Sequence, residues 1–318
     1  MHNRSALSLA LLGTFALLGA CSSSSSSSTS TTSGTTSGTG GSGTTTGATT
    51  STGTAGATGS GGGGGSGECP AGPGYAGGEQ KINITSIEAT VVDLDGAPMP
   101  DTSAQVCGID ICITGVTDKN GHVLLNVNKE LLAPAFKFGD ALLYAKLAIP
   151  VSDPVVTFPK LVTAKLPASG VKLEVGKDLT SGPVTLNVAA GGTIIVDDLT
   201  YDTDDKQLFR AAAIPVDQEG PVLDVDPTLK LELLYGVSPI ETIICPAAKV
   251  TVPNDANWPA GTDVEFVIHG VDVSQEWAAY GKWQKVSDGK VSADGKTVST
   301  VDGGGLPVIT AFGIRKKQ

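Results

Sequence analysis

Histidine is scarce in this chain, and its scarcity limits the chemistry that the chain can perform. The three histidines are His2, His122 and His269, and they form neither a His-Glu-x-x-His motif nor a close pair of zinc ligands. The region after residue 67 also lacks a Gly-x-Ser-x-Gly elbow, a Cys-x-x-Cys redox pair and a phosphate-binding Gly-x-x-x-x-Gly-Lys sequence. His122 and His269 are expected to be ordinary surface or half-buried residues. We therefore expect a protein that is not an enzyme and that needs no cofactor, apart from calcium at one acidic loop.

Basic residues are also few. The chain has 21 Lys and Arg against 32 Asp and Glu, which gives a formal net charge of -11 at pH 7. Nucleic acids and acidic membrane surfaces require clustered basic residues, and the cluster present here is the small tail Arg315, Lys316 and Lys317. The charge therefore argues against nucleic acid as a partner.

The apolar run at the N-terminus is too short to cross a bilayer. Arg4 is followed by 15 apolar or small residues, Ala6–Ala20, which is the layout of a secretory signal peptide. A membrane-spanning helix needs roughly 20 apolar residues. We predict that residues 1–20 are a signal peptide that is removed.

The end of this run, Leu18, Gly19, Ala20 and Cys21, resembles a bacterial lipobox. That resemblance implies that Cys21 becomes the first residue of the mature chain and carries diacylglycerol and an N-linked acyl chain. Several acyl chains anchor a protein stably in a membrane. The resemblance also implies that Ser22 is compatible with the outer membrane, so we expect a lipid-anchored protein of the bacterial outer membrane or cell surface. The alternative is an ordinary signal peptide with a chance cysteine.

Large apolar and charged residues are absent from Ser22 to Gly67, where the chain uses only Ser, Thr, Gly and Ala. Such a composition cannot build a hydrophobic core. We predict that residues 21–67 are a lipidated cysteine followed by a disordered linker, with a mean end-to-end distance of about 40 Å.

Four further cysteines, an even number in an exported chain, indicate two disulfides. Cys107 and Cys112 flank a four-residue loop, which would place them opposite each other in a hairpin. Cys69 and Cys245 would then form the second disulfide and close a long loop, which would stabilise the protein by about 4–5 kcal/mol. A zinc site is the alternative.

Long amphipathic helices are also missing after the linker. Short segments rich in Val, Ile and Thr alternate with Gly, Pro, Asn and Asp, which is typical of β-sandwiches and barrels. Short helical turns are expected only at residues 128–136 and 274–283. The Asp-Gly pairs that begin at Asp95, Asp288 and Asp294 favour tight hairpin turns. We predict an all-β fold with two tandem β-sandwich-like domains, residues 68–190 and 191–318.

Part of the first predicted domain resembles a known module. The segments ATVVDLDGAPMPDTSAQVC and GVTDKNGHVLLNV are similar to the carboxypeptidase-regulatory-like family, a transthyretin-like β-sandwich. In this resemblance Asp118 and Gly121 close the turn that leads into HVLLNV, and Pro98 and Pro100 restrict the backbone before the second strand. The matching positions are Asp93, Gly96, Pro98, Pro100, Thr117, Asp118 and Gly121. The resemblance implies a fold and no particular activity.

The second predicted domain resembles ZU5-type β modules of bacterial surface proteins. The resemblance rests on the turn Pro259–Thr262 and on the final strand, which ends in Phe312 and Gly313. It implies a β fold.

Two groups of residues are candidates for binding. An acidic loop could supply the oxygen ligands that calcium prefers, although its spacing is not that of an EF-hand and a solvated loop is the alternative. Its carboxylates are Asp197, Asp198, Asp202, Asp204 and Asp205. The aromatic group Trp277, Tyr280 and Trp283 could stack on sugar rings, and core packing is the alternative.

These observations predict an envelope-anchored bacterial lipoprotein that acts as a non-catalytic surface, binding or structural component. One alternative is a carbohydrate- or matrix-binding module. Another is an accessory subunit of an envelope enzyme or secretion complex that binds its protein partner through an edge strand.

Overall fold

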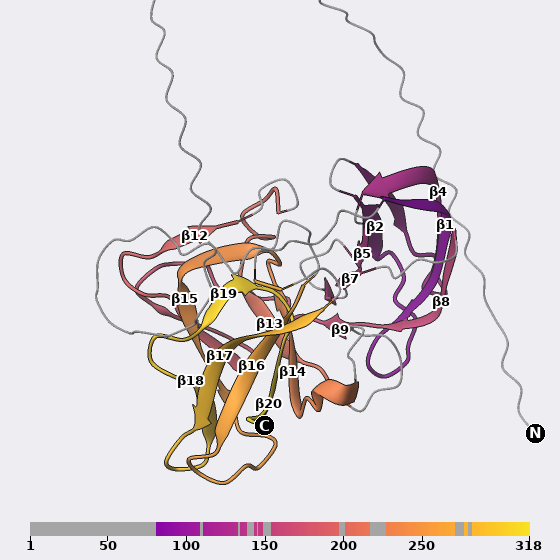
Figure 1. Cartoon of the computed structure of the whole chain (residues 1–318). Coiled ribbons are helices and arrows are strands. Elements are labelled where there is room, and N and C mark those ends of the chain that lie inside the picture. The colour runs from indigo at the N-terminus through magenta and orange to yellow at the C-terminus, as the bar shows by residue number, and fades with distance from the viewer. Residues whose placement is uncertain are drawn as a thin grey trace, which may run out of the picture. The chain divides into compact units, whose positions relative to one another are not determined.

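The computed structural model describes residues 81–108, 111–132, 134–138, 143–144, 146–148, 154–196, 201–216, 227–270, 277–278 and 282–318. Nearly every element in these ranges is a strand, as Figure 1 shows. The strands before residue 170 are β1 (Lys81–Val92), β2 (Ser103–Cys107), β3 (Cys112–Val116), β4 (His122–Leu132), β5 (Ala135–Phe138), β6 (Leu143–Tyr144), β7 (Lys146–Ala148), β8 (Val155–Val162) and β9 (Ala164–Lys165).

The later elements include one short helical turn, η1 (Pro227–Leu229), among strands. No helix in the ranges given above is long and apolar enough to cross a bilayer. The strands are β10 (Asp178–Ser181), β11 (Val184–Asn187), β12 (Thr193–Ile195), β13 (Arg210–Ala213), β14 (Leu233–Ser238), β15 (Thr242–Pro253), β16 (Asp263–His269), β17 (Trp283–Val291), β18 (Thr297–Thr300), β19 (Leu306–Ile309) and β20 (Phe312–Lys316).

Two small sheets share the first hydrophobic core. One has the order β4-β1-β8, with β1 antiparallel to β4 and parallel to β8, and the other has the order β3-β2-β5-β7. Alternate residues of β1 point inward, except that Ile84 and Ile87 are both fully buried because the register shifts between them. Phe136 of β5 stacks on Phe158 of β8, with ring centroids 5.7 Å apart, so the rings join the two sheets.

A tight turn built on one aspartate leads into β4. Asp118 Oδ1 accepts hydrogen bonds from the backbone N–H groups of Asn120 (2.8 Å) and His122 (3.0 Å), and Gly121 has a positive φ of 75°. These backbone hydrogen bonds, the one from His122 foremost, hold the pKa of Asp118 below its ordinary value. The same arrangement recurs at residues 93–97. The turn predicted at Asp118 and Gly121 is confirmed.

The larger sheet nearly closes on itself. Its strands follow the order β10-β11-β15-β18-β17-β16-β20-β14-β13, and β12 and β19 each pair with β15 beside this path. The two ends meet, because Ala211 N–H of β13 donates to Ser181 Oγ of β10 at 3.2 Å. The interior is a second core that contains the fully buried rings of Phe209, Phe266 and Phe312.

The all-β prediction is confirmed, and the larger sheet begins before the predicted boundary between residues 190 and 191. Strands β10 and β11 precede that boundary, and β11 pairs with β15. A third hydrophobic cluster also combines residues from both sides of the boundary, such as Val92 and Val162 with Leu234 and Val267.

Two local predictions are wrong. The described residues between 128 and 136 form no helical turn, because β4 extends to Leu132 and β5 begins at Ala135. Asp288 and Gly289 are not in a turn but inside β17, whereas the pairs at Asp95 and Asp294 do lie in turns. The glycine is needed for close packing, since a Cβ at position 289 would collide with the ring of Phe266.

Candidate functional site

A cavity of about 360 Å³ lies between β15, β17 and β19. It forms where β15 leaves its partner strand: Ile243 pairs with Val308, and the next pairing joins Ala248 to Leu306. Four residues of β15 therefore face a single residue of β19, Pro307. The extra residues make the strand bulge outward, which opens space beside β19.

Proline occurs on both sides of this opening. Pro246 lies in the bulged part of β15 and Pro307 lies opposite it in β19. Proline has no backbone N–H, so neither residue leaves an amide donor without a partner where the strands separate. The residue types thus suit a stable gap between paired strands.

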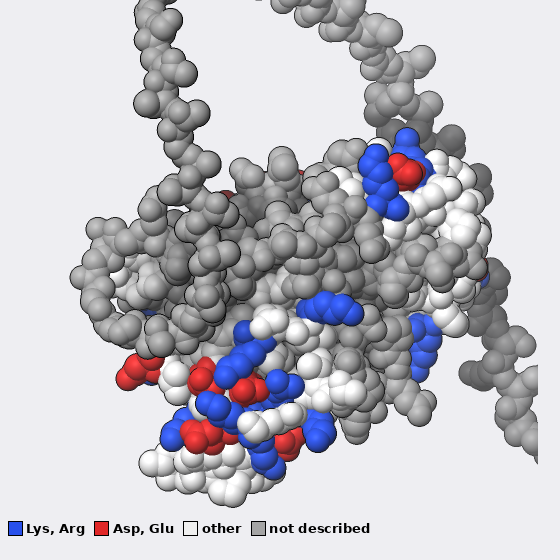
Figure 2. Space-filling model, in the orientation of Figure 1, with Lys and Arg blue, Asp and Glu red and all other residues white. Residues whose placement is uncertain are grey.

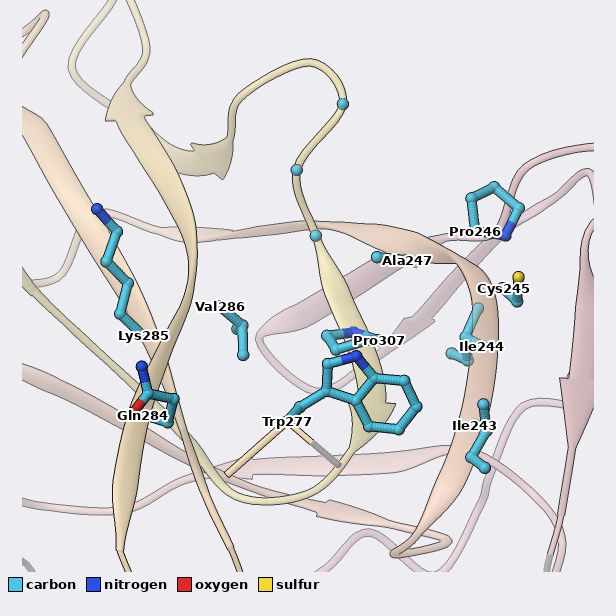
Figure 3. A pocket seen from close by; sticks show the side chains of 13 residues that line it. Ile243, Ile244, Cys245, Pro246, Ala247, Trp277, Gln284, Lys285, Val286 and Pro307 are labelled. Atoms are coloured by element: carbon cyan, nitrogen blue, oxygen red, sulfur yellow. The ribbon is translucent and has the colours of Figure 1, made fainter. Parts of the chain in front are cut away.

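The cavity wall is mainly apolar. It consists of residues 243–247 of β15, residues 284–286 of β17, the glycine turn 303–305, Trp277 and Pro307. Figure 3 shows the Trp277 indole beside Pro307, with its ring pointing toward the β15 wall. The glycines allow close packing, since a Cβ on Gly304 would collide with Ser287 and one on Gly305 with the carbonyl group of Ala248.

Among the described residues of the lining, the polar side chains are those of Gln284 and Lys285. The Lys285 ammonium group is held by two carboxylates, at 2.8 Å from Asp288 Oδ1 and 3.1 Å from Glu265 Oε1. It points away from Trp277 in Figure 3. Gln284 is exposed at the rim and carries an uncharged amide. The lining therefore offers an apolar interior with one neutral polar group at its edge.

A network of charges covers the face formed by β16, β17 and β20. Glu265 accepts hydrogen bonds from Arg315 Nε at 3.0 Å and is also paired with Lys285, while Lys317 lies 3.1 Å from Asp288. Lysine, arginine, aspartate and glutamate gather together there in Figure 2. Opposite charges alternate, so this face is neither an acidic nor a basic patch.

Glu265 is the least exposed carboxylate of this network, with 9% of its surface accessible. Burial acts to raise its pKa, but the hydrogen bonds and charges of Lys285 and Arg315 outweigh burial, so the pKa lies below its ordinary value. Asp288 behaves similarly: hydrogen bonds from Lys285 and Lys317 lower its pKa.

We expect Glu265→Gln to lower the free energy of unfolding by about 1 kcal/mol at neutral pH, and to have a progressively smaller effect as the pH falls through the folded-state pKa. A carboxylate with a lowered folded-state pKa stabilises the protein above its unfolded-state pKa, and this stabilisation is lost as the pH falls through the folded-state pKa. Urea unfolding of both proteins from pH 7 to pH 3 measures the difference.

A matched control for this prediction is Glu130→Gln. Glu130 pairs with Lys81 at 3.4 Å on the surface, where both side chains are more than half exposed. Such pairs contribute roughly 0–1 kcal/mol. A constant difference between Glu265→Gln and the unchanged protein at every pH would contradict the role given to the carboxylate.

Two of the predicted disulfide cysteines are joined. Cys107 ends β2, Cys112 begins β3, and the two form a disulfide across the hairpin with a Cα–Cα distance of 4.0 Å. This prediction is confirmed. Cys245 also takes part in a disulfide, and its predicted partner Cys69 lies outside the described residues, as does Cys21.

In the acidic loop, two of the predicted calcium ligands bind cationic side chains of the protein itself. Asp202 Oδ1 lies 2.9 Å from Lys206 Nζ, and this hydrogen bond lowers the pKa of Asp202. Asp205 Oδ1 lies 3.0 Å from Arg210 Nη2. These contacts account for the two carboxylates without a metal ion.

The remaining calcium candidates do not add a site in the part of the chain that the structure describes. Asp204 is exposed, and Asp197 and Asp198 fall outside that part. No group of three His, Cys, Asp or Glu residues that could hold a metal ion occurs within it. Calcium binding by the complete loop stays a prediction.

The aromatic candidates are placed in different surroundings. Trp277 packs against the core of the larger sheet, while Trp283 packs against the third cluster beside His269, with ring centroids 5.1 Å apart. Tyr280 lies outside the described residues. Of the two histidines that are described, His122 pairs with Glu88 at 2.9 Å and His269 is fully buried. Of the two aromatic candidates that the structure describes, Trp277 lines the cavity and Trp283 does not.

The β15 side of this cavity was not predicted from the sequence. The sequence features that could have indicated it are Gly303–Gly305 and the prolines Pro246 and Pro307, which lie inside segments with the alternating apolar pattern of strands. Proline in a strand is a mark of an edge or a bulge.

Comparisons with known proteins add little to this description. No protein-family model matches the chain, and no curated protein matches it. The solved structure of the full-length major pilin SpaD from Corynebacterium diphtheriae is similar over 74% of this chain, with 12% identity and a TM-score of 0.21. The similarity covers 57% of the pilin chain, and at this TM-score it supports no conclusion about function.

Proposed function

We propose that this chain is a lipid-anchored component of a bacterial outer envelope, which presents its β-rich part away from the membrane and acts without catalysis. The observation that carries the proposal is the apolar run that ends in Leu18–Cys21 and is followed directly by the linker, residues 22–67. A lipid anchor and a long uncharged spacer together suit the display of a folded unit at a distance from a bilayer.

The described ion pairs agree with a role in binding or structure. In the part of the chain that the structure describes, the carboxylates with shifted pKa values are shifted downward and remain charged at neutral pH. A general acid near neutral pH needs a carboxyl group with a raised pKa. Binding to a polysaccharide and assembly with an envelope protein stay predictions within this role.

The proposal is tested by replacing the cysteine that would carry the lipid. Cys21→Ser is expected to abolish incorporation of an alkyne-labelled palmitate in growing bacteria and to release the protein from the membrane fraction. The lost anchor leaves no acyl chain to insert into the bilayer. Fluorescence of the labelled band and immunoblots of membrane and soluble fractions measure the two effects.

The matched control is the double variant Cys107→Ser with Cys112→Ser, which removes two other cysteines and keeps Cys21. It should be labelled as strongly as the unchanged protein. Labelling that persists in Cys21→Ser, or that is absent from the unchanged protein, would show that the chain is not a lipoprotein anchored at this residue.

A further inference from the structure

We propose that the cavity between β15, β17 and β19 binds a small, uncharged molecule built around a flat apolar ring. The ligand site goes beyond the envelope role described above and does not depend on lipidation. It rests on the size, the wall shape and the polarity of the cavity.

The size of the cavity suits a small molecule. Its volume of about 360 Å³ lies in the lower part of the range of roughly 300–1,000 Å³ that small-molecule sites occupy. A macromolecular surface would need a much larger contact area than these few residues provide. A free small ligand is therefore the occupant that fits.

The walls favour a flat ring. The Trp277 indole and the rings of Pro246 and Pro307 are planar or nearly planar apolar surfaces, and Figure 3 shows Trp277 beside Pro307. Aromatic rings pack favourably face to face or edge to face with other rings. Ile243 and Ile244 provide the apolar wall toward which the indole points.

The polarity favours a ligand with few polar groups and no charge. The Lys285 ammonium group already contacts Glu265 and Asp288, so its charge is balanced within the protein. Of the described lining residues, Gln284 is then the side chain placed to exchange hydrogen bonds at the rim. A saccharide would bring many hydroxyl groups into this apolar interior, and hydroxyl groups buried without partners weaken binding.

The site is also preformed. The first part of the bulge is held by β12, which pairs with Ile243 to Cys245, and β19 pairs with β15 at both ends of the bulge, at Ile243 and Ala248. Cys245 in this wall is also disulfide-bonded. A cavity whose walls are already ordered loses little conformational entropy when a ligand binds.

The test uses the uncharged fluorescent probe N-phenyl-1-naphthylamine. The protein is residues 22–318, which lack the apolar run Ala6–Ala20 and the acylation site Cys21, so that no apolar segment, acyl chain or detergent takes up the probe. We expect saturable binding at one site, seen as increased probe emission and as energy transfer from tryptophan. Ala247→Phe, which adds a ring to the cavity wall, should weaken probe binding by at least about tenfold.

Two further variants make the result specific. Val286→Phe fills the cavity from the β17 wall and should give a similar loss, which guards against a folding defect in one variant. Ala213→Phe adds the same ring at an exposed position of β13 and should leave probe binding unchanged. Circular dichroism checks that each variant is folded.

Three outcomes would overturn the proposal. They are the absence of saturable probe binding, probe binding that is unaffected by both cavity-filling variants in folded protein, and displacement of the probe by the disaccharide of N-acetylglucosamine. The last outcome would assign the cavity to a sugar. None of them bears on lipidation, which the palmitate experiment tests separately.

Discussion

Replacing Arg210 with methionine is expected to lower the free energy of unfolding by about 3 kcal/mol. The guanidinium group is completely buried at the start of β13. Its Nη1 donates to the carbonyl oxygen of Asp205 at 2.8 Å, and its Nη2 donates to Asp205 Oδ1 at 3.0 Å and to the carbonyl oxygen of Ala168 at 3.4 Å. One side chain thus ties the acidic loop to the segment before β10.

Two effects of this substitution oppose each other. Methionine removes the cost of keeping a cation out of water, which favours the variant. It also leaves the carbonyl groups that Arg210 bonds without their donor, which disfavours the variant by roughly 1–3 kcal/mol for each group that stays buried. The second effect should dominate, because only one partner of each hydrogen bond is replaced.

Urea unfolding followed by circular dichroism measures this change. The matched control is Lys206→Met in the same loop, where the pair with Asp202 is exposed and a change of less than about 0.5 kcal/mol is expected. Arg210→Lys should also be destabilised, because a single ammonium group cannot reproduce the planar fork of donors. Equal stability of Arg210→Met and the unchanged protein would show that the buried guanidinium does not hold the loop.

The second large effect is expected for Phe312→Ala, at about 3–5 kcal/mol. Phe312 begins β20, is fully buried, and stacks on Tyr235 and Phe266 with ring centroids 5.0 Å and 6.3 Å apart. Removing its ring would leave a void between β14, β16 and β20 in the centre of the larger sheet. Chemical unfolding measures the loss, and Phe312→Leu, which keeps much of the volume, should lose less.

Tyr235→Phe is the control within this stack. Within the described residues, the Tyr235 hydroxyl is buried and has no hydrogen-bond partner. Burial, with a smaller effect of the Asp255 charge, raises the pKa of Tyr235 well above its ordinary value. Removing that hydroxyl keeps the ring and should leave the stability unchanged or slightly higher. A loss as large as that of Phe312→Ala would mean that the ring stacking is not what stabilises the sheet.

Local patterns in the sequence were sufficient to predict the strands, the turn at Asp118 and the hairpin disulfide. Each of these depends on residues close together in the chain: alternating apolar residues, an aspartate three positions before a glycine, and two cysteines around a short loop. The same local reasoning failed at Asp288–Gly289. There the glycine is required by the Phe266 ring of a neighbouring strand, which no local pattern reveals.

Predicting the cavity would have required contacts between residues that are even further apart in the sequence. It arises because β15 bulges away from β19, and the two strands are separated in the sequence by β16, β17 and β18. Trp277 was selected from the sequence as part of an aromatic group, yet its position beside Pro307 required the fold. The pairing of Lys285 with Glu265 and Asp288, which sets the polarity of the site, is likewise a product of strand register.

The contact between the end strands β10 and β13 affects how copies of the protein would interact when they are packed densely on a surface. A protein displayed at high density risks aggregation when a long sheet leaves exposed edge strands that neighbouring copies can pair with. In the described residues, the two end strands of the larger sheet instead cover each other through Ser181 and Ala211. Among the described strands, a partner that adds a strand could still use β12, which pairs with β15 and where Ile195 is 53% exposed, or an edge of a smaller sheet such as β3, where Val116 is 61% exposed.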